Sequence, residues 1–138
     1  MTVLLDLGIH ALRDAYRAGT LDVRQMIEEV LKRIAAAGDD KVWIARVPDD
    51  VLRAEADALH RRRDEALPLY GIPFAVKDNI DVAGLSTTAA CPGFTYDPKA
   101  SAEVVKRLTD AGAIVIGKTN LDQFATGLVG VRLSLIHI

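Results

Sequence analysis

The sequence has a single cysteine, few aromatic residues and no long hydrophobic run. With Cys91 alone among 138 residues, no disulfide can form within the chain. No apolar stretch approaches the roughly 18 to 20 residues that a membrane-spanning helix needs. The first residues contain neither the basic nor the apolar segment of a secretory signal. These absences predict a cytoplasmic protein with no membrane partner.

Positive and negative charges are nearly balanced in the sequence. The 17 lysines and arginines stand against 19 aspartates and glutamates, which gives a formal net charge of -2. A chain without a broad basic field lacks the electrostatic attraction that holds nucleic acid or anionic lipid. We therefore expect no nucleic-acid partner. The composition, 50% hydrophobic and 26% charged, is that of a globular protein.

Histidine and cysteine are too scattered to predict a metal site. His10, His60 and His137 lie in three separate segments, and none has a carboxylate or cysteine at ligand spacing on the same face. Cys91 follows a polar turn with no histidine near it in sequence, which favours a small half-buried side chain over a nucleophile. We expect no metal and no other cofactor.

The segment 1–66 has the apolar spacing of helices, whereas the prolines and glycines concentrate after it. Capping residues and glycines mark the ends of the predicted elements. We expect a helix from Leu5 that Asp6 caps and Gly19 ends, a helix that Thr20 caps and Gly38 ends, a strand over 41–47, and a helix that opens at Asp49 and runs to about Ala66.

The rest of the chain alternates strands with short helices, which predicts an α/β fold. Pro73 cannot donate a ladder hydrogen bond, so it must lie at a strand start or on an edge strand. We expect a strand over 72–76, a helix that Ser101 caps and Gly112 ends, a buried strand over 113–116, and a short helix over 120–126 with Leu121, Phe124 and Ala125 pointing inward.

Residues 112–119 match the phosphate-loop pattern G-x-x-x-x-G-K-[ST]. A phosphate loop follows a strand and leaves its intervening residues free to wrap around phosphates. Here those residues are Ala-Ile-Val-Ile, which predict a strand that follows a helix. We therefore reject nucleotide binding at this segment.

Lys77 emerges directly from an apolar strand and is followed by Asp78 and Asn79, the usual residues of a tight turn. A lysine with an ordinary pKa near 10.4 is neutral in only about one molecule in 2,500 at pH 7, so a basic role requires desolvation or a neighbouring cation. From these residues alone, a lysine that pairs with Asp78 or Asp81 is favoured over a catalytic base.

Several separate blocks of sequence resemble the amidase signature family, and they occur in the family's order. They are 71–79 (GIPFAVKDN), 84–88 (GLSTT), 104–105 (VV), 111–120 (AGAIVIGKTN) and Phe124. Within the family, segments 43–47 and 119–130 are most similar to the allophanate hydrolase branch. Agreement of several blocks is far more specific than any one of them.

The resemblance implies a mixed sheet covered by helices and an amide hydrolase that uses two serines and a lysine. Lys77 resembles the family lysine, which takes a proton through a bridging serine. By the same likeness, Asp78 and Asn79 form the turn that shapes the site, and Lys118, Thr119 and Asn120 support it. The implied partner is a small amide substrate, with a homodimer possible for the full-length protein. Ser101 stands where relatives often have aspartate.

The family's glycine- and serine-rich segment, which carries both catalytic serines, has no counterpart in these 138 residues. None of Ser86, Ser101 and Ser134 lies in a Gly-Ser-Ser context. We therefore expect an N-terminal fragment, inactive alone, whose incomplete sheet leaves residues 113–116 half covered. The alternatives are another amidase of the family, such as the subunit of a glutamine-dependent amidotransferase, or an inert truncated reading frame.

The final six residues depart from the family pattern and match the translation of a sequencing adapter. We expect helices and one short strand over 1–66, the start of the amidase core over 67–132, and a non-native tail over 133–138. A real apolar terminal strand is the alternative for that tail.

Overall fold

The computed structural model describes residues 5–63 and 65–127. Helices and strands alternate in it, which confirms the α/β prediction. No helix in this part of the chain is long and apolar enough to cross a membrane. The elements are α1 (Ile9–Ala18), α2 (Val23–Ala37), β1 (Trp43–Arg46), α3 (Asp49–His60), β2 (Pro73–Lys77), α4 (Glu103–Asp110) and β3 (Ile114–Thr119), with short 3-10 turns η1 (Pro92–Phe94) and η2 (Gln123–Ala125).

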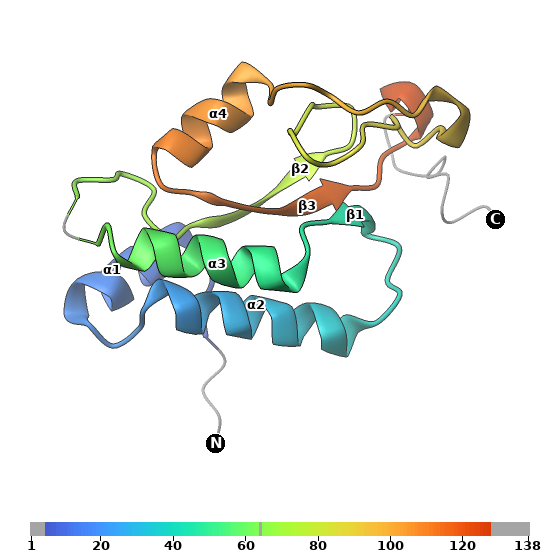
Figure 1. The fold of residues 1–138 in the computed structure, drawn as a ribbon. Coiled ribbons are helices and arrows are strands. Elements are labelled where there is room, and N and C mark those ends of the chain that lie inside the picture. The colour runs from blue at the N-terminus through green and yellow to red at the C-terminus, as the bar shows by residue number, and fades with distance from the viewer. Residues whose placement is uncertain (1–4, 64, 128–138) are drawn as a thin grey trace.

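Three strands form a mixed sheet in the order β1-β3-β2. The central strand β3 pairs antiparallel with β1 and parallel with β2. Pro73 is the first residue of β2, and β2 is an edge strand, as its missing N–H predicts. In Figure 1, α3 and α2 lie below the sheet and α4 lies above it.

The core lies between the sheet and the pair α2 and α3. The stripe of α2 that we expected to be apolar is buried, with Met26 and Ile27 fully enclosed. Leu52 of α3 is fully buried on the facing side. Helix α1 joins this layer through Tyr16, whose hydroxyl donates to the carbonyl oxygen of Gly71 at 2.9 Å, just before β2.

Helix α2 begins with a capping box, but its cap is not the residue that we predicted. Asp22, rather than Thr20, accepts from the backbone N–H groups of Arg24 (2.8 Å) and Gln25 (3.0 Å). The Gln25 side chain accepts in return from the N–H of Asp22 at 2.8 Å. This reciprocal arrangement satisfies donors that a helix start leaves unpaired.

Two other predicted caps are also wrong. Helix α1 starts after Gly8, and Asp6 instead accepts from the Gly8 N–H, outside the helix. Helix α4 starts after Ala102, because the hydroxyl of Ser101 accepts from the N–H of Ala83 in a distant loop. The predicted ends at Gly19 and Gly38 are confirmed, and both glycines have positive φ.

Two predicted helices are shorter in the structure. Helix α3 ends at His60 rather than near Ala66, because the N–H groups of Arg62 and Arg63 bond three residues back and tighten the chain into turns. Residues 120–126 contain only the turn η2. Leu121 is buried as expected, but Phe124 is half exposed and Ala125 is exposed, so their predicted inward orientation is wrong.

Strand β3 is buried along nearly its whole length, contrary to the expectation of a half-covered strand. All four residues 113–116 are buried, because the strand has a neighbour on each side and helices on both faces. Gly117 allows β1 to approach closely, since a Cβ there would lie 2.5 Å from the carbonyl oxygen of Ala45. The strand also confirms that residues 114–119 form no phosphate loop.

The prediction of a non-native tail at 133–138 lies outside the described residues. The division into segments 1–66 and 67–132 stays a prediction.

Candidate active site at the ends of two strands

Two lysines lie at the carboxyl ends of the parallel neighbours β2 and β3, in very different environments. Lys118 pairs in register with Val76, and Lys77 with Thr119. Because successive side chains of a strand alternate between faces, Lys118 shares the buried face with Val76, and Lys77 lies on the opposite face. Lys118 is fully buried, whereas Lys77 is exposed.

Asp78 is fully buried and forms an ion pair with Lys118 rather than with Lys77. Its Oδ1 lies 2.9 Å from Lys118 Nζ. Its Oδ2 accepts from the backbone N–H of Thr88 at 3.1 Å and from the Thr88 hydroxyl. The Oδ1 atom has no directed hydrogen bond, so the ion pair is its main interaction. The expected turn therefore carries a buried charge on its first residue.

The ammonium group of Lys118 is bonded on a second side by the loop that follows β2. Its Nζ donates to Thr87 Oγ1 at 3.1 Å, and that hydroxyl donates to Asp81 Oδ1 at 2.8 Å. Tyr96 donates to the same Asp81 oxygen at 2.7 Å. The hydrogen bonds from Tyr96 and Thr87 lower the pKa of Asp81, and the bond to Asp81 raises the pKa of Tyr96.

Lys77 has no such partner among the described residues. Within residues 5–63 and 65–127, no carboxylate lies within ion-pair distance of its ammonium group. The interpretation in which Lys77 pairs with Asp78 or Asp81 is therefore wrong. Lys118 pairs with Asp78, Asp81 accepts from Thr87 and Tyr96, and the amine of Lys77 remains available.

The remaining predicted support residues lie around this arrangement. The carbonyl oxygen of Thr119 accepts from the N–H of Asp78 at 3.1 Å, which continues the β2–β3 pairing past Lys77. Asn120 joins the end of β3 to the segment before β1, because its side-chain amide donates to the carbonyl oxygen of Lys41 at 3.2 Å. Asn79 is exposed.

Sequence reasoning missed the residues that enclose the buried pair. Thr87, Thr88, Asp81 and Tyr96 were not among the predicted site residues. Their contacts join positions 6 to 31 residues apart in sequence, for which helix or strand spacing gives no signal. The block at 84–88 that resembles the amidase signature family was the available indication.

Other nucleophilic side chains nearby are engaged or half-buried. The hydroxyl of Ser86 donates to Asp97, and Ser101 Oγ accepts from the N–H of Ala83. Cys91 is half-buried, as its sequence context predicts. The described part of the chain brings together no group of three histidine, cysteine or acidic residues that could hold a metal ion.

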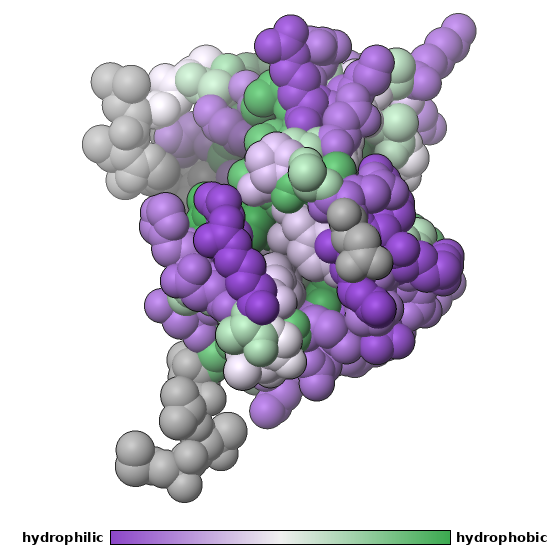
Figure 2. Space-filling view, turned by 90° about the vertical axis from the view of Figure 1, so that its left-hand side faces the viewer, coloured by the Kyte–Doolittle hydropathy of each residue, from purple (hydrophilic) through white to green (hydrophobic). Residues whose placement is uncertain are grey.

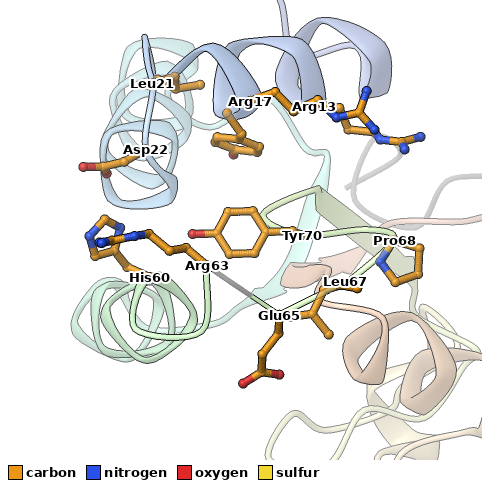
Figure 3. Close-up of a pocket in the computed structure, with 13 residues that line it drawn as sticks. Arg13, Arg17, Leu21, Asp22, His60, Arg63, Glu65, Leu67, Pro68 and Tyr70 are labelled. Carbon is orange, nitrogen blue, oxygen red and sulfur yellow. The ribbon is translucent and has the colours of Figure 1, made fainter.

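A separate cavity of about 510 Å³ lies at the other end of β2. Figure 2 looks onto this side of the molecule, where hydrophilic side chains predominate. Figure 3 shows Tyr70 projecting between α1 and the end of α3, with Arg13 and Arg17 above it and His60 beside Arg63. None of the predicted site residues lines this cavity, so it does not coincide with the candidate active site.

The fold and the strand-end site define a mixed α/β protein with an accessible lysine beside a buried ion pair. Comparison with known proteins identifies the class. The profile of the Amidase family matches residues 25–135. The chain therefore belongs to the amidase family, which confirms the resemblance seen in its sequence blocks.

Individual relatives agree with this membership. Urea amidolyase of Saccharomyces cerevisiae is 52% identical over 109 residues, which cover 78% of this chain and 6% of that protein. The glutamyl-tRNA(Gln) amidotransferase subunit of Rhizorhabdus wittichii is 41% identical over 132 residues, which cover 92% of this chain and 26% of the relative. Selenomethionine-substituted Kluyveromyces lactis allophanate hydrolase has a TM-score of 0.70 at 52% identity, covering 80% of this chain and 18% of that chain. The chain thus spans about a quarter or less of each relative.

Proposed function

We propose that this chain is the N-terminal part of an amide hydrolase and that Lys77 is its general base. The observation that carries the proposal is the contrast between the two strand-end lysines. Lys118 is buried and paired, whereas Lys77 is exposed and has no carboxylate within ion-pair distance among the described residues. Of these two strand-end lysines, Lys77 is the one that can present an amine to a reacting group without first breaking a buried ion pair.

The reaction we propose is the Ser-Ser-Lys form of nucleophilic catalysis. Neutral Lys77 takes the proton of a bridging serine, which takes the proton of the attacking serine, and that serine adds to the amide carbonyl. The C–N bond then breaks as the proton returns from Lys77 through the bridging serine to the leaving amine, and water hydrolyses the resulting acyl-enzyme. Asp78 and Asn79 shape the turn beside the base, and Lys118, Thr119 and Asn120 support it. No serine of this chain is assigned to either role, so we expect these 138 residues to be inactive alone.

The substrate that we propose is allophanate, hydrolysed to ammonia and carbon dioxide in urea degradation. Its support is the 52% identity to urea amidolyase and the same identity to an allophanate hydrolase structure. For the full-length protein we further propose a cytoplasmic homodimer that binds a small amide and needs no cofactor.

A second candidate is the glutamine-dependent amidotransferase. It is favoured by coverage, since that relative aligns with 92% of this chain, including much of the segment before residue 25. The lower identity of 41% makes it the weaker proposal.

Ammonia release tests the proposal. We would compare the 138-residue chain with a version extended by the downstream gene sequence, using allophanate, glutamine and a simple aliphatic amide. We expect the extended protein to release ammonia from allophanate and the short chain to be inactive. Lys77→Ala in the extended protein should remove turnover, because the nucleophile then has no base.

The matched control is Lys106→Ala, which removes an exposed lysine from α4. It should leave turnover unchanged. Activity with glutamine but not allophanate would favour the amidotransferase, and activity of the extended Lys77→Ala variant would refute the role of Lys77.

A further inference from the structure

Both the backbone and the side chain of Asp78 make close contacts, although Asp78 directly follows the exposed Lys77. Its N–H donates to the carbonyl oxygen of Thr119 at 3.1 Å, and its own carbonyl oxygen accepts from the N–H of Ala89 at 3.1 Å. Its carboxylate contacts Thr88 and Lys118. Both the backbone and the side chain of Asp78 are therefore fixed, which leaves Lys77 with a rigid neighbour on its C-terminal side.

The buried charges also join the loop after β2 to the central strand. Lys118 comes from β3, whereas Asp78 and Thr87 come from the loop. Each of these three residues has at most 1% of its surface exposed. Removal of one charge would leave its partner buried and uncompensated, so the loop could not keep this position. The relation between this loop and β3 thus depends on the intact pair.

We propose that the buried Asp78–Lys118 ion pair positions Lys77 for proton transfer by fixing the backbone at the end of β2. This inference rests on the proposed role of Lys77 as the general base. Asp78 and Lys118 are positioning residues here, because both act through Lys77. Displacement of a reacting group by about 1 Å can slow a reaction by roughly 100-fold.

The pair also has an electrostatic consequence for Lys77. The loop after β2 brings Asp78, Asp81, Cys91, Tyr96 and Asp97 to this end of the sheet, β3 and the segment after it bring Lys118 and Asp122, and the segment before β1 brings Asp39, Asp40 and Lys41. Loss of the Lys118 charge leaves excess negative charge beside Lys77 and favours its protonated form. Loss of the Asp78 charge leaves excess positive charge and favours the neutral form.

The experiment measures kcat, KM and the pH dependence of kcat/KM in the extended protein with allophanate. The variants are Lys118→Met, Asp78→Asn and the double variant that carries both. We expect each single variant to lower kcat about 10- to 100-fold with little change in KM. The acidic limb of the profile should move to higher pH in Lys118→Met and to lower pH in Asp78→Asn, and return toward wild type in the double variant.

Opposite shifts separate an effect on Lys77 from a general loss of folding, because both single variants destabilise the fold in the same direction. Lys106→Met, on the exposed face of α4, is the control and should leave the profile unchanged. If a single variant does not fold, Thr87→Val replaces the test: it removes the hydroxyl between Lys118 and Asp81 at nearly constant volume and should lower kcat without raising KM.

The outcomes distinguish this inference from the function on which it rests. Loss of activity in Lys77→Ala, together with unchanged kcat and pH profile in folded Lys118→Met, Asp78→Asn and Thr87→Val, would overturn the positioning role alone. Full activity in Lys77→Ala would overturn the general base, and the positioning role with it. A lower kcat at nearly unchanged KM in the folded variants supports the positioning role, and opposite movement of the acidic limb in the two single variants shows that the charges of the pair also act on Lys77.

Discussion

The helical layer and the strand-end site handle charge in opposite ways. Between α2 and α3, Arg53 contacts Glu28 at 2.6 Å, but both side chains are about half exposed and apolar residues beneath them form the interface. At the ends of β2 and β3, Lys118 and Asp78 form an ion pair at 2.9 Å from which solvent is excluded. Water therefore screens the first pair and not the second.

The two ion pairs have similar distances between their charged atoms, but removal of one partner has a different energetic cost in each. An exposed pair exchanges its contact for water when one partner is removed, so little is lost. A buried pair leaves an uncompensated charge in the interior, although the intact pair itself contributes little net stability. The strand-end site is thus sensitive to single substitutions for reasons that apolar packing does not share.

The largest expected effect comes from breaking the buried pair. Lys118→Met should lower the free energy of unfolding by about 3 to 5 kcal/mol, because the Asp78 carboxylate stays buried without its cation. Urea denaturation followed by circular dichroism measures this change. The double variant Lys118→Met with Asp78→Asn should recover part of the loss, and a single variant as stable as wild type would contradict the account of the site.

A core substitution in the helical layer should come next. Leu52→Ala on α3 removes a fully buried side chain and should cost about 3 kcal/mol through lost burial and the cavity left behind. Its neighbour Val51 is 41% exposed, so Val51→Ala serves as the matched control and should have a much smaller effect. Equal losses in the two variants would show that α3 packs differently from the structure.

The capping box of α2 should have a smaller effect. Asp22→Ala removes the acceptor for two backbone N–H groups and should cost about 1 kcal/mol, whereas Asp22→Asn should be nearly neutral. The hydrogen bond from Arg24 lowers the pKa of Asp22. A lowered pKa means that the ionised carboxylate stabilises the fold above its ordinary pKa near 3.9 and that this contribution is lost as the pH falls below it.

Thermal denaturation of wild type and Asp22→Ala from pH 7 to pH 2 measures this pH dependence. The difference between the two proteins should shrink below about pH 4. A difference that grows with acidity would contradict the assigned direction.

The sequence predicted the parts of the fold that depend on local pattern. The apolar stripe of α2, the glycines that end α1 and α2, and the buried strand β3 follow from spacing and composition. The residue that caps α2 was predicted wrongly. Thr20 and Asp22 are both good caps, and the reciprocal bond with Gln25 decides between them. At α2 the deciding bond is local, whereas at α4 a tertiary contact with Ala83 takes Ser101 away from the cap.

The same limit applies to the site. Lys77 and the turn after it could be found from sequence, because the strand and the polar residues are contiguous. The partner of Asp78 could not, since two lysines end neighbouring strands and only the pairing of β2 with β3 places one beneath the loop. Phe124 was misplaced for a related reason: its positive φ in η2 turns it away from the helical orientation we assumed.

The exposed pair between α2 and α3 provides the smallest and most discriminating prediction. Glu28→Gln and Arg53→Gln, alone and combined, form a double-mutant cycle whose coupling energy isolates their interaction. We expect a weak favourable coupling at low salt that disappears in 1 M sodium chloride, because the Debye length then falls to about 3 Å. The corresponding cycle at Asp78 and Lys118 should show strong coupling that salt barely changes, since solvent ions cannot reach either charge. If both cycles respond to salt alike, water reaches the strand-end pair, and the exclusion of solvent that distinguishes the two regions is refuted.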